Sequence, residues 1–331
     1  MQVVDFDAIE RNAKYFKRKL GGSKLCAVLK NNAYGHGLVH VARRIAEFVD
    51  CFAIGSVDEA EQVQFLNKDI LVLLPQNRRN TEIAIKRNFI LTVDSFETLK
   101  IVEEEARRLK ITPRLHIKFD SGMSRLGFKY NQIEQLSKKL QSTKFRVQGV
   151  FSHFYGDSMV DCDNQFDYFS RCASGLECSL NQTLTKHIAN TGATLLSPKY
   201  HLDMARVGLG LFGYGDENLQ PAKSVYADVI AVKSVDAGSV VGYGAKYICK
   251  NSTQIAVLNV GYATGLPRTL VGAKIKISER TFPVVAICMA MSLIDIGNAD
   301  VKVGDLATLL GDGINIANDK VIIYELLCNL K

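Results

Sequence analysis

Short runs of apolar residues recur through the first two-thirds of the chain, mostly separated by polar segments with helical periodicity. The runs are rich in Val, Ile, Leu and Phe and are nearly continuous rather than alternating, which is typical of parallel strands covered on both faces. They are LCAVLK (25–30), CFAIGS (51–56), ILVLLP (70–75), FILTVD (89–94), RLHIKFD (114–120), VQGVFSHF (147–154), KHIANT (186–191) and HLDMARVG (201–208).

Helical patterns fill most of the gaps between these runs. Amphipathic sequences predict helices over 57–66, 95–110 and 131–141, with Ser95 as a helix start. Eight strands alternating with helices predict an α/β fold with an N-terminal (β/α)8 TIM-like barrel. A doubly wound parallel sheet is the alternative, because periodicity alone does not separate the two. The gap from 191 to 201 is short for a full helix, so one crossover is expected to be abbreviated.

The pattern changes after residue 216. Helical periods give way to short strands alternating with Gly and Asp turns, which predicts a C-terminal, mostly-β domain. We therefore expect a barrel over 6–216 and a β domain over 217–331, joined through GYGDENLQPAK (213–223). The final KVIIYELLCNL fits either a strand or a closing helix.

Composition narrows the function classes. The net charge of +7 is spread along the 331 residues without a basic run, so we expect no nucleic-acid partner. The eight cysteines have neither CxxC nor zinc spacing, which favours reduced thiols in the cytoplasm and no metal site. The N-terminus has acids where a signal peptide needs an apolar stretch, and the longest apolar runs are too short to span a bilayer.

Polar side chains gather at the ends of the predicted strands, where a barrel builds its active site. These residues are Lys30, Arg125, His153, Asn190, Thr191 and Arg206. Each alone has a structural explanation, but their convergence on one face favours a site. A lysine in such a place can lose its charge, and its neutral amine attacks carbonyls, so a Schiff base with pyridoxal phosphate (PLP) is the leading use.

PLP carries a phosphate, and a glycine-rich segment offers a place for it. RVGLGLFGYG (206–215) contains a GxGxxG pattern, but no βαβ unit opens there, so a dinucleotide site is disfavoured. A glycine-rich loop after strands seven and eight of a barrel is the usual phosphate site. The hydroxyl of Thr191 is positioned in the sequence to join it.

AVLKNNAYGHG (27–37) resembles the PLP-lysine signature of the alanine racemase family. Further family motifs follow in order over essentially the whole chain: DSGMSRLGF (120–128), SHF (152–154), ANTGA (189–193), ARVGLGLFGYG (205–215), VGYG (241–244), VGYATGLPR (260–268), ICMAMSLIDIG (287–297) and IIYELLC (322–328). The resemblance implies a PLP barrel, a C-terminal β domain that residues 1–5 join, and a homodimer with shared active sites. It also implies two-base racemisation of alanine, a small amino acid, to supply D-alanine for peptidoglycan.

By motif position, the resemblance implies that Lys30 holds PLP and is one base, and that Tyr262 of the partner subunit is the other. His153 would link Arg206, which faces the pyridine nitrogen, to Tyr262. The implied cofactor-binding set is Lys30, Tyr34, Arg125, His153, Asn190, Thr191, Arg206, Gly208, Leu209 and Tyr324. The implied substrate-binding set is Arg125, Met289, Tyr243 and Ile322, and Lys118 matches a position that is often carbamylated.

Two departures from the family pattern leave alternatives open. Thr264 stands where the family usually has the acid of GYADG, and Ala290 where it has the acid of CMDQ. Neither is a base, so activity is expected, but pocket polarity and substrate range change. The alternatives are a serine or broader-specificity racemase, a decarboxylase of the same fold, and a PLP-binding homologue of low activity. The sequence leaves the balance of monomer and dimer open as well.

Overall fold

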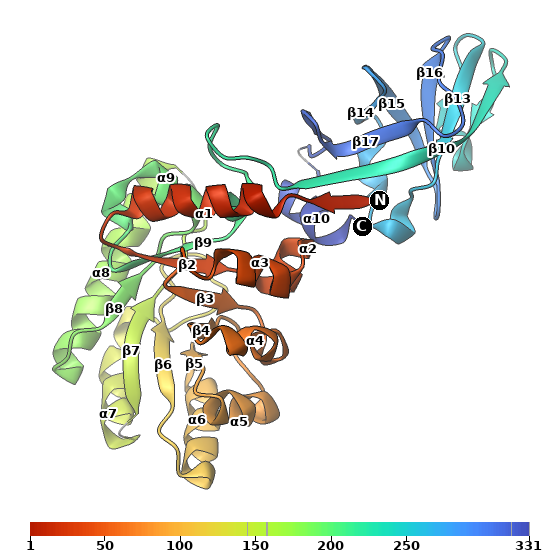
Figure 1. Ribbon diagram of the computed structural model, residues 1–331. Helices are drawn as coiled ribbons and strands as arrows, with labels where there is room; N and C mark the ends of the chain where they lie inside the picture. Colours follow the sequence, from red (N-terminus) through yellow and green to blue (C-terminus); the bar gives the residue numbers. More distant parts are fainter. Residues whose placement is uncertain (144, 157, 319, 331) are drawn as a thin grey trace. The chain divides into compact units, whose positions relative to one another are not determined.

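The eight strands expected in the first two-thirds of the chain form one parallel sheet in the computed structural model (Figure 1). The structure describes residues 1–143, 145–156, 158–318 and 320–330. Each strand overlaps one predicted run: β2 (Lys24–Val28), β3 (Cys51–Ile54), β4 (Asp69–Val72), β5 (Ile90–Val93), β6 (Arg114–Lys118), β7 (Arg146–Phe151), β8 (Thr185–His187) and β9 (Met204–Val207). Their order in the sheet is β9-β2-β3-β4-β5-β6-β7-β8.

Backbone hydrogen bonds between the two outermost strands close this sheet. The amide of Asp203, just before β9, donates to the carbonyl of Lys186 in β8 at 3.2 Å. The amide of Arg206 in β9 donates to the carbonyl of Ala189 at 3.0 Å. A doubly wound sheet would keep two open edges, so the closed ring confirms the predicted barrel.

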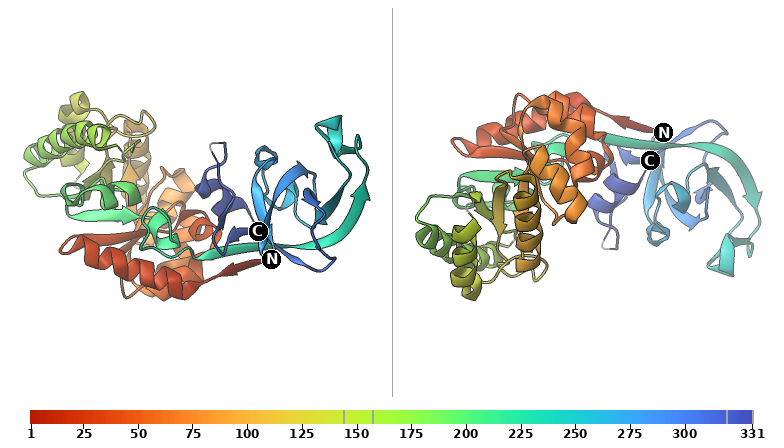
Figure 2. Two further views of the ribbon diagram at one scale, coloured as in Figure 1. Left: turned by 90° about the horizontal axis from the view of Figure 1, so that it is seen from above. Right: turned by 90° about the horizontal axis from the view of Figure 1, so that it is seen from below.

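Helices lie on the outside of the ring of strands (Figures 1 and 2). They are α1 (Phe6–Leu20), α3 (Leu38–Ile45), α4 (Val57–Val63), α5 (Arg78–Lys86), α6 (Phe96–Leu109), α7 (Ile133–Thr143), α8 (Met159–Leu180) and α9 (Thr191–Leu196). The short α2 (Lys30–Gly35) comes just after β2 and is left-handed, since Asn31–Tyr34 have positive φ. The three predicted amphipathic helices are α4, α6 and α7. Ser95 starts α6 as expected, because its hydroxyl accepts a hydrogen bond from the Thr98 amide at 3.1 Å. The abbreviated crossover is α9 followed by the single turn η3 (Pro198–Tyr200).

A second, antiparallel sheet forms the mostly-β part of the chain. Its strands are β1 (Gln2–Val4), β10 (Lys223–Val235), β13 (Thr253–Leu258), β14 (Lys274–Ile277), β15 (Arg280–Ile287), β16 (Ser292–Gly297), β17 (Leu306–Gly311) and β18 (Ile314–Asn315). Because β10 pairs with both β13 and β17, the strands β10-β13-β16-β15-β14-β17 close into a ring. A bulge between Val229 and Ala231 lets the long β10 bend from one partner to the other.

Smaller elements complete the described chain. A hairpin of β11 (Val240–Val241) and β12 (Tyr247–Ile248) forms a separate sheet, and the C-terminal segment is the helix α10 (Ile323–Asn329) rather than a strand. The remaining single turns are η1 (Gln64–Leu66), η2 (Tyr130–Gln132), η4 (Leu209–Phe212), η5 (Tyr243–Ala245), η6 (Tyr262–Thr264) and η7 (Arg268–Leu270).

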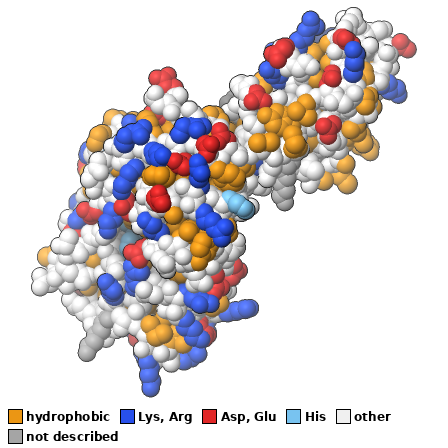
Figure 3. Space-filling view, viewed as in Figure 1, with side chains coloured by type: hydrophobic (Ala, Val, Ile, Leu, Met, Phe, Trp, Pro, Cys, Tyr) orange, Lys and Arg blue, Asp and Glu red, His pale blue; other side chains and the backbone are white. Residues whose placement is uncertain are grey.

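The chain divides into two compact units. Residues 6–33 and 37–220 form the barrel unit, and residues 1–5, 34–36 and 221–331 form the β unit. Basic and acidic side chains are interspersed over the face drawn in Figure 3. Among the residues that the structure describes, no helix combines the length and apolar character that a membrane crossing needs.

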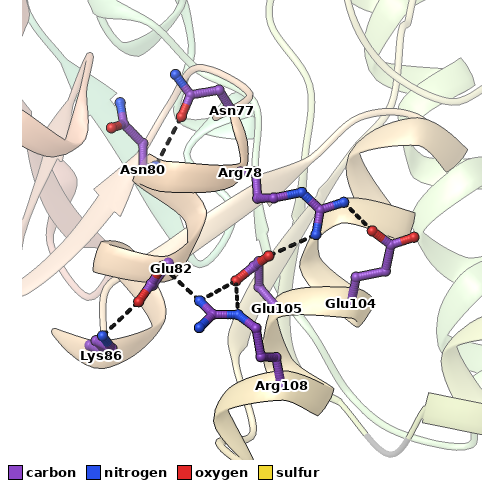
Figure 4. Close-up of polar contacts among 8 residues, drawn as sticks. All are labelled: Asn77, Arg78, Asn80, Glu82, Lys86, Glu104, Glu105 and Arg108. Carbon is purple, nitrogen blue, oxygen red and sulfur yellow. Dashed lines mark hydrogen bonds and ion pairs between the residues drawn. The ribbon is translucent and has the colours of Figure 1, made fainter.

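A network of charges ties α5 to α6 on the barrel unit (Figure 4). Its centre is Glu105, which is only 1% exposed. The Glu105 carboxylate accepts hydrogen bonds from Arg78 Nη1 at 2.8 Å and from Arg108 Nε and Nη2 at 2.9 and 2.6 Å. Arg108 also pairs with Glu82, which in turn pairs with Lys86. The buried carboxylate therefore serves as a shared acceptor that joins the two helices.

We predict that Glu105→Gln lowers the free energy of unfolding by about 2 kcal/mol. The substitution removes the negative charge that strengthens the hydrogen bonds from Arg78 and Arg108, and it turns one of the two accepting oxygens into an NH2 group that faces their donors. Urea denaturation followed by circular dichroism measures the change. Glu134→Gln on α7 is the matched control: its carboxylate is 81% exposed and pairs with the exposed Lys138, so its loss should stay within about 0.5 kcal/mol. Equal effects of the two substitutions would contradict the role given to Glu105.

Candidate active site

Lys30 lies two residues beyond the end of β2, at the end of the barrel where the carboxyl ends of the strands meet. The amide of Leu29 donates to the Ala53 carbonyl at 3.0 Å, so ladder hydrogen bonding reaches the residue before the lysine. Gly55 lies beside it: a β-carbon at this position would be 3.2 Å from the Lys30 β-carbon and 3.0 Å from Glu59 Oε2. The sequence analysis missed this glycine, which leaves room for the lysine side chain.

The chain leaves Lys30 through a left-handed turn. Asn31–Tyr34 have φ values of 53–54°, a conformation that costs non-glycine residues about 1–2 kcal/mol each. Two side chains hold the turn: Glu59 Oε1 accepts from the Asn32 amide at 2.7 Å, and Asn32 Oδ1 accepts from the Leu38 amide at 2.8 Å. Strain of this kind persists only where the surroundings enforce it, and it clusters at functional sites.

Arg206 lies inside the barrel on β9 and is 4% exposed. Its Nη2 donates to the carbonyls of Ser152 at 2.7 Å and Ile188 at 3.2 Å, and its Nη1 donates to Nδ1 of His187 at 2.7 Å. Burial lowers the pKa of Arg206 to about 10, which still leaves it protonated at neutral pH. A fixed cation therefore sits among strand-end carbonyls.

This cation fixes the tautomers of two buried histidines. A guanidinium only donates, so His187 Nδ1 accepts, and His187 Nε2 carries the proton and donates to His116 Nδ1 at 2.8 Å. Burial holds the pKa of His187 well below its usual range and lowers that of His116 to about 3, with the charge of Arg206 contributing to both. Gly149 gives the His116 ring its space, because a β-carbon there would be 2.7 Å from the ring.

The sequence analysis missed both of these histidines. They are the histidines inside the apolar runs RLHIKFD and KHIANT. The signal that could have identified them is a histidine inside a run that is otherwise mostly apolar.

Four cations surround His153 at the mouth of the barrel. Its Nδ1 is 3.3 Å from Nη2 of Arg206, and it lines a small cavity with Lys118 and Arg125. Burial, and then the charges of Arg206, Arg125, Lys118 and Lys30, hold the pKa of His153 well below its usual range. Burial and the charges of Arg206 and Arg125 lower the pKa of Lys118 to about 8. The positive charge gathered here suits an anionic ligand.

Asp120 shapes the loop that carries Arg125. Its Oδ1 accepts from the amides of Gly122 and Ser124, each at 3.0 Å, and its Oδ2 accepts from Lys129 Nζ at 2.7 Å. Burial alone would raise the pKa of Asp120, but the Lys129 ammonium and the two amides lower it below its usual range. The carboxylate stays charged and so keeps the loop tied.

The glycine-rich segment after β9 is held by Thr191. Its Oγ1 accepts from the amides of Gly208 at 3.3 Å and Gly210 at 3.1 Å. Leu209 begins the single turn η4, so the segment lacks the long helix that a dinucleotide site needs. Asn190 uses its side-chain oxygen to cap α9. The hydroxyl and amides that the sequence placed near a phosphate thus do meet.

In the β unit, the turn that carries Tyr262 is docked on the turn that carries Met289. The amide of Tyr262 donates to the Cys288 carbonyl at 3.0 Å, and the amide of Ala263 donates to the Met289 carbonyl at 2.9 Å. Thr264 closes its own turn: its hydroxyl accepts from the Gly261 amide at 3.2 Å and donates to the Gly261 carbonyl at 3.0 Å. Thr264 therefore keeps an oxygen acceptor at this position without the negative charge of an acid.

Tyr262 and Tyr243 line one cavity of about 500 Å³ in the β unit, together with Arg268 and Lys246. Tyr243 is 83% exposed and Tyr262 44%. Met289 and Ile322, the other predicted substrate contacts, are 61% and 60% exposed.

The two tyrosines predicted to bind a phosphate lie together in the β unit. The ring centroids of Tyr34 and Tyr324 are 5.9 Å apart, and the rings are tilted by 41°. Tyr34 is 5% exposed, and burial raises its pKa, so its hydroxyl is protonated and able to donate. Burial also raises the pKa of Tyr324.

Comparison with known proteins gives the same family for both units. Residues 4–216 match the N-terminal domain of alanine racemase and residues 222–331 its C-terminal domain. Alanine racemase 1 of Oceanobacillus iheyensis is 34% identical over 334 residues, which cover 93% of this chain and 88% of that protein. The alanine racemase of D-cycloserine-producing Streptomyces lavendulae superposes with a TM-score of 0.92 at 28% identity, covering 100% of this chain and 94% of the other. The fold also matches that of the Bartonella henselae alanine racemase with covalently bound pyridoxal phosphate, with a TM-score of 0.90, 24% identity, and coverage of 100% of this chain and 96% of the other.

Proposed function

Because the chain belongs to the alanine racemase family, a family of isomerases, we propose that it interconverts L- and D-alanine with PLP as its cofactor. The observation that carries this proposal is the position of Lys30. It lies just beyond the end of β2, and its charge, like those of Arg206, Arg125 and Lys118, acts on His153. An amine in such a place can form a covalent bond with the aldehyde of PLP.

Each unit carries residues with the chemistry that this cofactor needs. Lys118, Arg125 and Arg206 concentrate positive charge beside His153, which suits a phosphorylated ligand. The Thr191 hydroxyl accepts from the amides of Gly208 and Gly210, which leaves its own proton to donate to the phosphate, with Gly208 beside it. The other proposed phosphate ligands are Leu209, Tyr34 and Tyr324, and Asn190 adds an amide at the same strand end.

PLP, when bound, supplies an electron-withdrawing ring that makes the hydrogen on the amino acid's α-carbon acidic. Racemisation then requires one group to remove this proton and another to return one on the opposite face. We assign these tasks to Lys30 Nζ and to Tyr262 Oη of the partner subunit. Arg125 would bind the substrate carboxylate, as guanidinium groups commonly do.

Arg206 and His153 would set the charge state of the site. With a pKa of about 10, the buried Arg206 keeps its protons at neutral pH and would donate a hydrogen bond to the ring nitrogen without protonating it. His153, whose pKa is well below its usual range, stays neutral. It can therefore pass a hydrogen bond from Arg206 towards the second base without adding a charge.

We propose that the enzyme is a homodimer in the cytoplasm and supplies D-alanine for peptidoglycan. Support for the dimer comes from the β unit, where Tyr243, Met289 and Ile322 are each at least 60% exposed. Such residues would become buried if each β unit completed the partner's site, with Met289, Tyr243 and Ile322 near the substrate. A two-fold dimer would then hold two composite sites.

We predict that borohydride reduction of the purified protein fixes PLP to Lys30, because an amine bonded to the cofactor's aldehyde becomes irreversibly alkylated on reduction. Peptide mass spectrometry locates the adduct. Lys30→Ala should carry no adduct and should lack the yellow absorption, whereas Lys24→Ala, at the exposed start of the same strand, should keep both. An adduct on another lysine in the wild-type protein would contradict the assignment.

We also predict that Lys118 is carbamylated. With a pKa of about 8, roughly a tenth of the amine is neutral at pH 7 and roughly half at pH 8. The neutral amine adds to CO2, forming an N–C bond and releasing a proton, and the carbamate gains a negative charge among the cations. Carbon-13 NMR after incubation with labelled CO2 should show a carbamate signal that Lys118→Ala loses and Lys138→Ala, which alters an exposed lysine on α7, keeps. A signal that survives Lys118→Ala would refute the site.

The shared site predicts complementation between two inactive variants. Mixing Lys30→Ala with Tyr262→Phe under subunit exchange makes about half the dimers mixed, and each mixed dimer has one intact site, so activity should reach about a quarter of wild type. Racemisation is measured with a chiral assay. Lys30→Ala mixed with Arg125→Ala is the control: both residues belong to the barrel unit, so every site keeps a lesion. No recovery in the first mixture, with mixed dimers shown to be present, would rule out the shared site.

A further inference from the structure

Lys223 is a buried cation outside the sets of residues assigned above. It is the first residue of β10 and is 1% exposed. Its Nζ donates to the carbonyls of Leu327 and Leu330, each at 2.8 Å. These carbonyls belong to the C-terminal end of α10, where a helix leaves its last carbonyls without partners of its own. The ammonium also complements the negative end of the helix dipole.

The same end of α10 packs against the turn that carries Tyr34. Gly35 has φ +77°, and a β-carbon there would be 2.4 Å from the Leu327 carbonyl oxygen and 3.3 Å from Lys223 Nζ. The backbone at Gly35, the helix end and the lysine therefore meet at one point. Any shift of the helix end would move the turn with it.

The turn before Gly35 and the helix α10 each carry a tyrosine that is proposed to bind phosphate. Tyr34 precedes Gly35 directly, Tyr324 lies on the first turn of α10, and the ring centroids are 5.9 Å apart. A lysine suits the junction because one ammonium has three donors on a long stem and can satisfy two carbonyls at once. Removing it would leave two buried carbonyls short of donors and would loosen the helix end.

We propose that Lys223 is a positioning residue that sets the spacing of the Tyr34 and Tyr324 hydroxyls for the phosphate of the cofactor. The proposal rests on the proposed function, since it takes the ligand of these hydroxyls to be the phosphate of PLP. Lys223 acts through α10 and the turn at Gly35 and has no role in the bond to Lys30. Replacing Lys223 should therefore weaken the binding of the phosphate group of PLP and leave the binding of the pyridoxal ring unchanged.

The test compares PLP with pyridoxal, which lacks the phosphate, on the full chain stripped of cofactor. Dissociation constants are measured by absorbance for the wild type and for Lys223→Met, which has similar length but no donor. The affinity for PLP should fall about tenfold, the worth of one or two hydrogen bonds, while the affinity for pyridoxal stays unchanged. Lys233→Met, an exposed lysine on the same strand, should bind both as the wild type does, and Lys223→Arg should recover part of the loss.

The outcomes separate this proposal from the proposed function. If the wild type binds PLP but Lys223→Met loses affinity for PLP and pyridoxal equally, or for neither, the positioning role is overturned while the function stands. If the wild type binds neither ligand, the proposed function itself fails. Should Lys223→Met not fold, Lys223→Leu, which also lacks a donor, takes its place, and the same equal loss or unchanged binding overturns the proposal.

Discussion

A buried guanidinium is the constraint around which the barrel site is arranged. Arg206 is surrounded by strand-end carbonyls and a histidine, and its nearest hydrogen-bond partners are all acceptors. Burial of a charge is costly unless it is hydrogen-bonded, so the ends of β7 and β8 must hold their carbonyls in place for the fold to tolerate it. The same demand fixes the tautomer of His187 and, through it, that of His116.

The positive charge at the barrel mouth has a further effect on every titratable neighbour. Burial is the first cause of the lowered pKa of His153 and of Lys118, and the charge of Arg206 is the second for both. His153 therefore stays neutral, and Lys118 is partly neutral near pH 8. Both follow from placing several cations close together where they are shielded from water. Bringing in an anion would relieve this repulsion, so ligand binding and the charge state of the site are coupled.

Local patterns in the sequence were enough to predict the barrel and much of its mouth. Continuous apolar runs located all eight strands. The polar residues at the ends of these runs predicted a site that includes Lys30, His153 and Arg206, and the charges of Lys30 and Arg206 do act on His153 in the structure. The Ser95 cap followed from a three-residue spacing. These features depend on neighbours in the chain, which a sequence displays directly.

What the sequence did not reveal depends on distant partners. The left-handed turn after Lys30 needs Glu59 and Asn32 to hold it, and no periodicity announces such a turn. The space for His116 comes from Gly149 on the next strand, and the end of α10 is satisfied by Lys223, which lies 104 residues away along the chain. The last segment fits either a strand or a helix in the sequence, because seven residues are too few for intrinsic propensity to decide. Its helical form depends on contacts with residues far away in the chain, such as Lys223.

The make-up of the β unit has a consequence for how the protein is made on the ribosome. Residues 2–4 pair with residues 223–225 at the start of β10, and Tyr34 contacts Tyr324, so these segments find partners that are synthesised much later. Domains usually fold as they emerge, the N-terminal one first. Here the barrel can close once β9 has emerged, whereas the first strand must wait for β10 and the turn after Lys30 must wait for α10. Lys30 is thus translated early, while the segment that follows it acquires its final surroundings only after α10 has been made.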